Sequence, residues 1–194
     1  MKSISIERGD ALLIIDIQND FLPGGSLAVP GGEQVIPVIN RCIEKFDALG
    51  NPLFLTSDWH PGDHSSFIDQ GGPWPAHCVA GSHGAEFSPE LRLPENFEIF
   101  STGFRRECAG YSGFEETELL DKLESSGIRR LFVAGLATDY CVLHTVLDAL
   151  RYGFQVYLLQ DAVRAVNLQA GDGGKALQSM RENGAEMISS DMIL

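Results

Sequence analysis

The sequence has no long apolar run, no paired cysteines and no excess of positive charge. Its longest apolar runs, such as residues 11–15, are too short to cross a bilayer, and its N-terminus lacks a secretory signal pattern. The four cysteines include no CxxC pair, which argues against a disulfide framework. The formal net charge of -13 repels nucleic acid and anionic membranes. We therefore expect a cytoplasmic protein that binds neither.

Phosphate-binding loops and the serine-hydrolase elbow are also missing. Neither GxGxxG nor GxxxxGK[ST] occurs, which leaves dinucleotide and nucleoside-triphosphate binding unsupported. The segment GYSGF at residues 110–114 is not a GxSxG elbow. No repeat, low-complexity tract or interdomain linker is visible. The 194 residues suit one domain over residues 1–194 with a single large core.

Strand and helix patterns alternate along the chain. Short apolar runs predict strands at residues 11–15, 52–56, 98–101, 131–134, 155–159 and 186–188. Amphipathic stretches between them predict helices at residues 33–49, 114–125, 141–152 and 174–183. This alternation indicates an α/β fold with a mainly parallel sheet covered by helices on both faces. The long irregular stretch of residues 59–94 is typical of a functional loop.

Ligands of such sheets bind at the carboxyl ends of the strands, where two candidates for chemistry lie. Cys141 ends GLATDYC, which leads from a strand into a helix, and free N–H groups there would stabilise a thiolate. A buried core cysteine explains this position equally well. Asp16 directly follows the first strand and could exchange a proton with the thiol, or simply cap a turn.

A second candidate site contains histidines. Asp58 and His60 are two residues apart on an extended segment after the second strand, so their side chains point the same way. His77 could complete a site with two nitrogens and one oxygen, which suits zinc and also iron or manganese. His64 could be a further ligand. Spacing alone equally allows solvated loop histidines.

Five segments together resemble the isochorismatase-like cysteine hydrolase superfamily, and within it the nicotinamidase/pyrazinamidase branch. They are LLIIDIQNDFLPGGSLAVPGG (12–32), SDWHPGDHSSF (57–67), WPAHCVAGSHGAEF (74–87), AGYSGFEET (109–117) and GLATDYCV (135–142). The resemblance implies a three-layer α/β/α fold with a six-stranded mainly parallel sheet. It also implies hydrolysis of a small aromatic amide such as nicotinamide to the carboxylic acid and ammonia, through a thioester on Cys141.

The same resemblance implies roles for individual residues. Asp16 and Cys141 would be catalytic, with the N–H groups of Ala137 and Cys141 as the oxyanion hole and a cis bond between Leu136 and Ala137. One divalent metal ion, zinc above the alternatives, would be held. Its implied ligands are Asp58, His60 and His77, with His64 as an additional one. The implied walls of the substrate pocket are Phe21 and Trp74, with Tyr111 near them.

One position departs from the family pattern. Members carry a lysine where this chain has Thr102, and no lysine lies between Lys45 and Lys122. Arg105 or Arg106 could replace the missing cation, although arginine would not give up a proton. Alternatively, the enzyme is slow or acts on a different bond, or it has lost amidase activity.

Two other functions therefore stay open at this point. The first is an isochorismatase-type or carbamoyl-amide hydrolase, because those activities share the scaffold. The second is a non-catalytic protein that binds a metal or a ligand, an option that Thr102 supports. The sequence also leaves open whether the chain forms a homo-oligomer.

Overall fold

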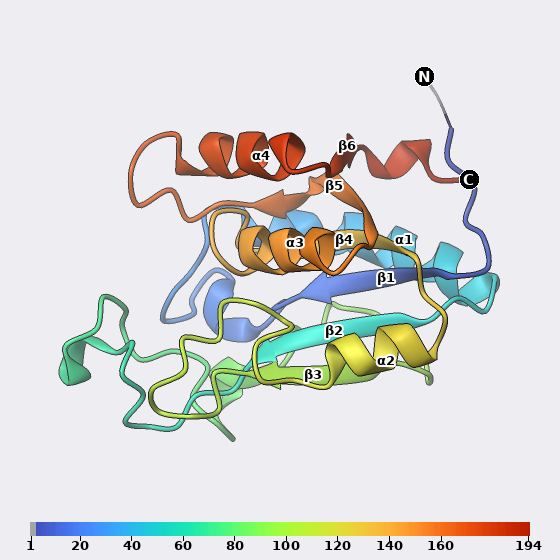
Figure 1. Ribbon diagram of the computed structural model, residues 1–194. Coiled ribbons are helices and arrows are strands. Elements are labelled where there is room, and N and C mark those ends of the chain that lie inside the picture. The colour runs from blue at the N-terminus through green and yellow to red at the C-terminus, as the bar shows by residue number, and fades with distance from the viewer. Residues whose placement is uncertain (1–2) are drawn as a thin grey trace.

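The computed structural model describes residues 3–194 and shows a six-stranded sheet between two layers of helices (Figure 1). All paired strands are parallel, in the order β3-β2-β1-β4-β5-β6. The strands are β1 (Asp10–Ile15), β2 (Leu53–Asp58), β3 (Glu98–Thr102), β4 (Arg130–Leu136), β5 (Gln155–Arg164) and β6 (Glu186–Ile188). The predicted three-layer α/β/α fold is confirmed.

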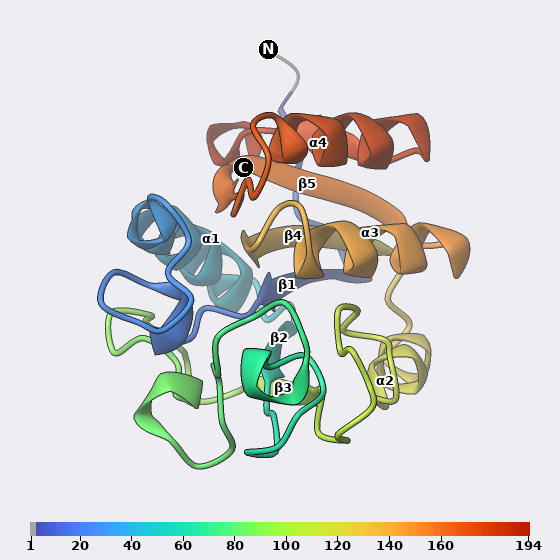
Figure 2. The ribbon, with the colours of Figure 1, turned by 90° about the vertical axis from the view of Figure 1, so that its left-hand side faces the viewer.

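Helix α1 (Ile36–Ala48) covers one face of the sheet, and α2 (Leu119–Ser125), α3 (Cys141–Arg151) and α4 (Asp172–Glu182) cover the other (Figure 2). Successive residues of β1 point to opposite faces. Its even-numbered leucine and isoleucine residues pack with α1, and its odd-numbered ones pack with the other three helices. All of β1 is therefore buried, which explains its continuous apolar run. Within residues 3–194, no helix is both long and apolar enough to span a bilayer.

Helix α2 is shorter than the sequence indicates. It begins at Leu119 rather than at residue 114, so this part of the predicted helix was wrong. The Thr117 hydroxyl donates to the Gly113 carbonyl, and the Gly113 N–H donates to the Thr145 hydroxyl. Such bonds between side chains and backbone compete with a helical turn. The predicted helix at residues 33–49 likewise begins as a 3-10 turn, Gly32–Val35, before α1.

The strand order places a crevice at the centre of the sheet. From β1 the chain runs outward to β2 and β3, then returns to β4 on the other side of β1. Connections therefore leave the carboxyl ends of β1 and β4 in opposite directions, which opens a binding crevice there. Asp16 directly follows β1, and Ala137 directly follows β4. The irregular segment between β2 and β3 lies at the same end of the sheet (Figure 1).

Candidate active site

The structure places Asp16 beside the Cys141 thiol. Cys141 is the first residue of α3, and both side chains are buried. Ligand atoms of Asp16, Asp58 and Cys141 all lie within 4.8 Å of one another. The Thr56 hydroxyl donates to Asp16 Oδ1 over 2.6 Å and fixes that carboxylate. The carboxylate and sulfur expected at the ends of two different strands therefore share one small volume.

Close approach of β1 and β4 depends on a glycine. Gly135 pairs with Ile15 and has a φ of 121°. A Cβ at this position would lie only 2.0 Å from the Ile15 carbonyl oxygen. Any larger residue would separate the two strands just before Asp16 and Ala137. The glycine of GLATDYC thus allows the two halves of the site to meet.

The surroundings of Cys141 favour the neutral thiol. Burial raises the pKa of Cys141 well above its ordinary value, and the Asp16 carboxylate raises it further. Burial also raises the pKa of Asp16, as does the nearby charge of Asp58. This differs from the thiolate that the helix N-terminus favours, because the carboxylates of Asp16 and Asp58 lie within 4.8 Å of the sulfur and, within residues 3–194, neither pairs with a lysine or an arginine. A nucleophilic Cys141 must therefore transfer its proton during the reaction.

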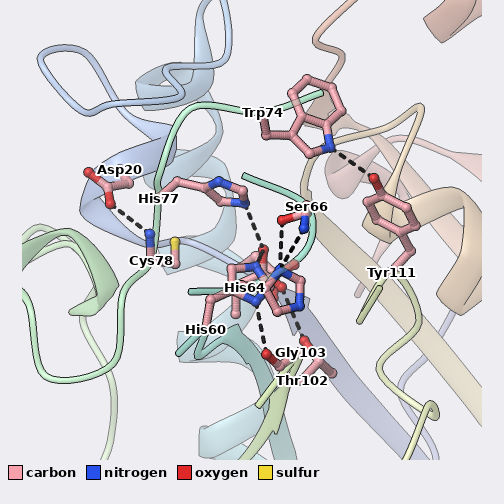
Figure 3. Close-up of polar contacts among 12 residues, drawn as sticks. Asp20, His60, His64, Ser66, Trp74, His77, Cys78, Thr102, Gly103 and Tyr111 are labelled. Atoms are coloured by element: carbon pink, nitrogen blue, oxygen red, sulfur yellow. Dashed lines mark hydrogen bonds and ion pairs between the residues drawn. The ribbon is translucent and has the colours of Figure 1, made fainter. Parts of the chain in front are cut away.

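A second cluster, the histidine cluster, consists of Asp58, His60 and His77, whose ligand atoms also lie within 4.8 Å of one another. His60 Nδ1 lies 3.0 Å from the Gly103 carbonyl oxygen (Figure 3), and His77 Nδ1 lies 2.8 Å from the Pro75 carbonyl oxygen. Carbonyl oxygens only accept, so both Nδ1 atoms carry the proton. Each Nε2 then faces Asp58 Oδ2, at 3.4 Å from His60 and 3.8 Å from His77.

These three residues fit a divalent metal ion. Two imidazole lone pairs and a carboxylate oxygen converge on one buried point, where a cation removes the repulsion between them. Burial lowers the pKa of His77, which favours the neutral ring that binds metals. Burial alone would also lower the pKa of His60, but Asp58 raises it above the ordinary value. A metal ion would replace the proton that Asp58 attracts to this ring.

The structure does not bring His64 into this cluster, and its role as an additional ligand stays a prediction. Its ring stacks on that of His60, with centroids 4.1 Å apart. However, its Nδ1 lies 2.7 Å from the Ser66 hydroxyl (Figure 3), and its Nε2 lies 2.8 Å from the Cys108 carbonyl oxygen. Both ring nitrogens of His64 thus bond to other groups, and the ring packs against that of His60.

Thr102 reaches the same cluster without bringing a charge. It is the last residue of β3, and its hydroxyl donates to Asp58 Oδ1 over 3.1 Å. Arg105 and Arg106 do not replace the missing lysine, because they pair at the surface with Glu116 and with Glu107. Within residues 3–194, neither Asp16 nor Asp58 forms an ion pair with a lysine or an arginine.

A small, mainly apolar cavity connects the thiol with the histidine cluster. It brings together Phe21, Trp74, Tyr111, Ala137 and Cys141, all of which the sequence singled out, with Asp58 and His77. Trp74 Nε1 donates to the Tyr111 hydroxyl over 2.8 Å, which fixes both aromatic side chains (Figure 3). Sequence reasoning missed the remaining residues of the lining, which are Leu27, Val29, Tyr140 and Val166. Of these four residues, only Tyr140 could have been found from the sequence, because it directly precedes Cys141 in GLATDYC.

The backbone at Ala137 has the expected form. The peptide bond between Leu136 and Ala137 is cis. Ala137 lines the cavity together with Cys141. The first N–H groups of a helix lack partners within the helix. A substrate oxygen in the cavity would therefore lie near the end of α3 that can donate hydrogen bonds.

Sequence reasoning missed Gln18, whose side chain fixes the backbone of Asp58 in the histidine cluster. This fully buried side chain accepts from the Asp58 N–H over 2.9 Å and donates to the Asp58 carbonyl over 2.7 Å. It also donates to the Ala85 carbonyl over 2.9 Å. The signal was a polar residue three positions after a buried strand, in DIQNDF. Gln18 thus fixes the backbone of a metal-ligand candidate to the end of β1.

We expect Gln18→Ala to lower the free energy of unfolding by about 3 kcal/mol, because three buried backbone groups lose their partner at about 1–3 kcal/mol each. Urea unfolding with linear extrapolation measures this change. Gln178→Ala serves as the control, since exposed Gln178 bonds only to Glu182 and its loss should change stability by about 0.5 kcal/mol or less. Equal stabilities of the two variants would contradict the structural role of Gln18.

Comparison with known proteins identifies the family. The isochorismatase domain matches residues 10–192. The nicotinamidase of Escherichia coli (strain K12) is 39% identical, with 91% of this chain and 93% of the relative covered. Among solved structures, a pyrazinamidase of Pyrococcus horikoshii in complex with zinc has a TM-score of 0.89 and 44% identity, over 93% of this chain and 99% of that chain. PnC1 from L. infantum in complex with nicotinate has a TM-score of 0.92 and 36% identity, over 99% and 98%. The chain belongs to the isochorismatase family.

Proposed function

We propose that this protein is an amidase for small aromatic amides and hydrolyses nicotinamide or pyrazinamide to the carboxylic acid and ammonia. The observation that carries the proposal is the single cavity that contains Cys141, aromatic side chains and two members of the histidine cluster. The nicotinamidase relative, the pyrazinamidase structure with zinc and the PnC1 structure with nicotinate support the same substrate class.

In the proposed reaction, the substrate ring lies against Phe21 and Trp74, and its amide carbon faces Cys141. Asp16 takes the thiol proton as the sulfur attacks the carbonyl carbon. The N–H groups of Ala137 and Cys141 bind the oxygen as it becomes negative. Asp16 then gives the proton to the departing nitrogen, and ammonia leaves a thioester on Cys141. Water hydrolyses this thioester to the carboxylic acid and restores the thiol.

Asp58, His60 and His77 would hold one divalent metal ion in this scheme. Zinc suits two imidazoles and a carboxylate, and iron and manganese are alternatives. When bound, the ion would supply positive charge and an open coordination position for a ring nitrogen. The chain's own residues perform the chemistry at the amide. The cytoplasmic location and a homo-oligomer stay predictions.

An ammonia-release assay with matched substrates tests the function. We expect turnover of nicotinamide and pyrazinamide, and a lower kcat/KM for benzamide, which has the same amide and ring shape but no ring nitrogen. Removal of the metal with a chelator should bring nicotinamide to the level of benzamide. Release only from an aliphatic carbamoyl amide would instead favour the related hydrolase function. Absence of release from every amide would contradict an amidase.

A further inference from the structure

The end of β3 contacts two of the three residues in the histidine cluster. In the pairing of β2 with β3, Thr102 lies opposite Asp58. Residues opposite one another on neighbouring strands present their side chains to the same face of the sheet. The Thr102 hydroxyl can therefore meet the Asp58 carboxylate, and it does so at Oδ1 over 3.1 Å. The other carboxylate oxygen, Oδ2, is the one that faces the histidines.

The next residue, Gly103, orients His60 in a similar way. The carbonyl oxygen of Gly103 lies 3.0 Å from His60 Nδ1 (Figure 3). This contact keeps the proton on Nδ1 and leaves the Nε2 lone pair for the ion. Gly103 has a φ of 62°, and a Cβ there would lie 2.3–2.4 Å from the His60 ring. Only glycine allows the backbone to approach the ring this closely.

We propose that Thr102 and Gly103 are positioning residues of the metal centre, which orient Asp58 and His60 toward a bound divalent cation. This inference rests on the metal site of the proposed function. The Thr102 hydroxyl also lies 3.5 Å from the Ser57 carbonyl oxygen, but the carboxylate is closer and charged, and is therefore the stronger acceptor. Groups that orient the residues bound to a metal strengthen its binding. The Thr102 hydroxyl thus supports the metal centre at the position where family members carry a lysine.

Zinc affinity of the full-length, metal-stripped protein tests the hydroxyl, measured by competition with a chromogenic chelator. We expect Thr102→Val, which keeps the shape but removes the donor, to weaken zinc binding about tenfold. Thr102→Ser keeps the donor and should bind zinc within about twofold of wild type. Ser101→Ala is the matched control. Its hydroxyl lies 3.1 Å from that of Ser57 and contacts no ligand candidate, so this loss should leave zinc affinity unchanged.

The glycine is tested with a pair of matched variants. Gly103→Ala and Gly71→Ala both place alanine in the left-handed region, but a Cβ at Gly71 meets no atom within 4 Å. We therefore expect only Gly103→Ala to lose zinc affinity, by about tenfold or more. In the cobalt-substituted protein, the visible spectrum of the Gly103→Ala variant should also change, because the His60 ring must move.

Several outcomes overturn the inference. Wild-type zinc affinity in Thr102→Val would do so, as would equal losses in the valine and serine variants or in the two glycine variants. If wild-type protein binds no zinc at all, the proposed metal site fails. If wild type binds zinc and none of the variants weakens it, only the positioning role fails. The glycine pair keeps the test decisive if Thr102→Val does not fold.

Discussion

Cys141→Ala should reduce ammonia release from nicotinamide by roughly 10⁴-fold or more, because within residues 3–194 no other cysteine lines the cavity to form the thioester. The free energy of unfolding should change little, since the substitution removes one sulfur at the edge of the cavity. Initial rates of ammonia release and urea unfolding measure the two effects. The variant should still bind nicotinamide, because the aromatic walls and the histidine cluster are intact.

Cys108→Ala provides the control for this experiment. Cys108 is a half-buried free cysteine that does not line the cavity, so its loss should leave turnover unchanged. Mass spectrometry of wild-type protein quenched during turnover should show an acyl group on Cys141. Turnover of Cys141→Ala within about tenfold of wild type would rule out the covalent scheme.

His77→Ala should lower zinc affinity and kcat/KM for nicotinamide by at least about a hundredfold, since it removes one of three convergent ligand atoms. Activity toward benzamide should fall much less, because that substrate has no ring nitrogen to contact an ion. Zinc content by elemental analysis and kinetics with both amides separate these effects. Equal losses for the two amides would contradict a metal site that holds the ring.

Two histidine controls sharpen this prediction. His83→Ala removes an exposed ring that pairs with Glu86 at the surface, and it should change neither zinc content nor turnover. His64→Ala should retain one zinc ion per chain, because both ring nitrogens of His64 bond to other groups. Loss of zinc from His64→Ala, at a level equal to that of His77→Ala, would show that His64 binds the ion as well.

Much of the fold, and the placement of Asp16 and Cys141 at one end of the sheet, followed from local sequence patterns. Continuous apolar runs predicted the six strands because parallel strands are buried on both faces. The topology rule for parallel sheets then placed Asp16, Asp58 and Cys141 at one edge without any structure. The spacing of Asp58 and His60 also decided their common direction. These predictions succeeded because they depend on residues adjacent in the chain or on a general property of such sheets.

The tertiary structure alone decided which polar groups meet across the sheet. Thr102 and Asp58 are 44 residues apart, and their contact follows from the register of β3 against β2. Gln18 is 40 residues from Asp58, and the partners of His64 lie partly in a loop on another segment. The pKa of Cys141 likewise depends on carboxylates from two other strands. Sequence periodicity determined which side chains face inward, but register and packing determined which of them touch, because hydrogen bonds act over about 3 Å.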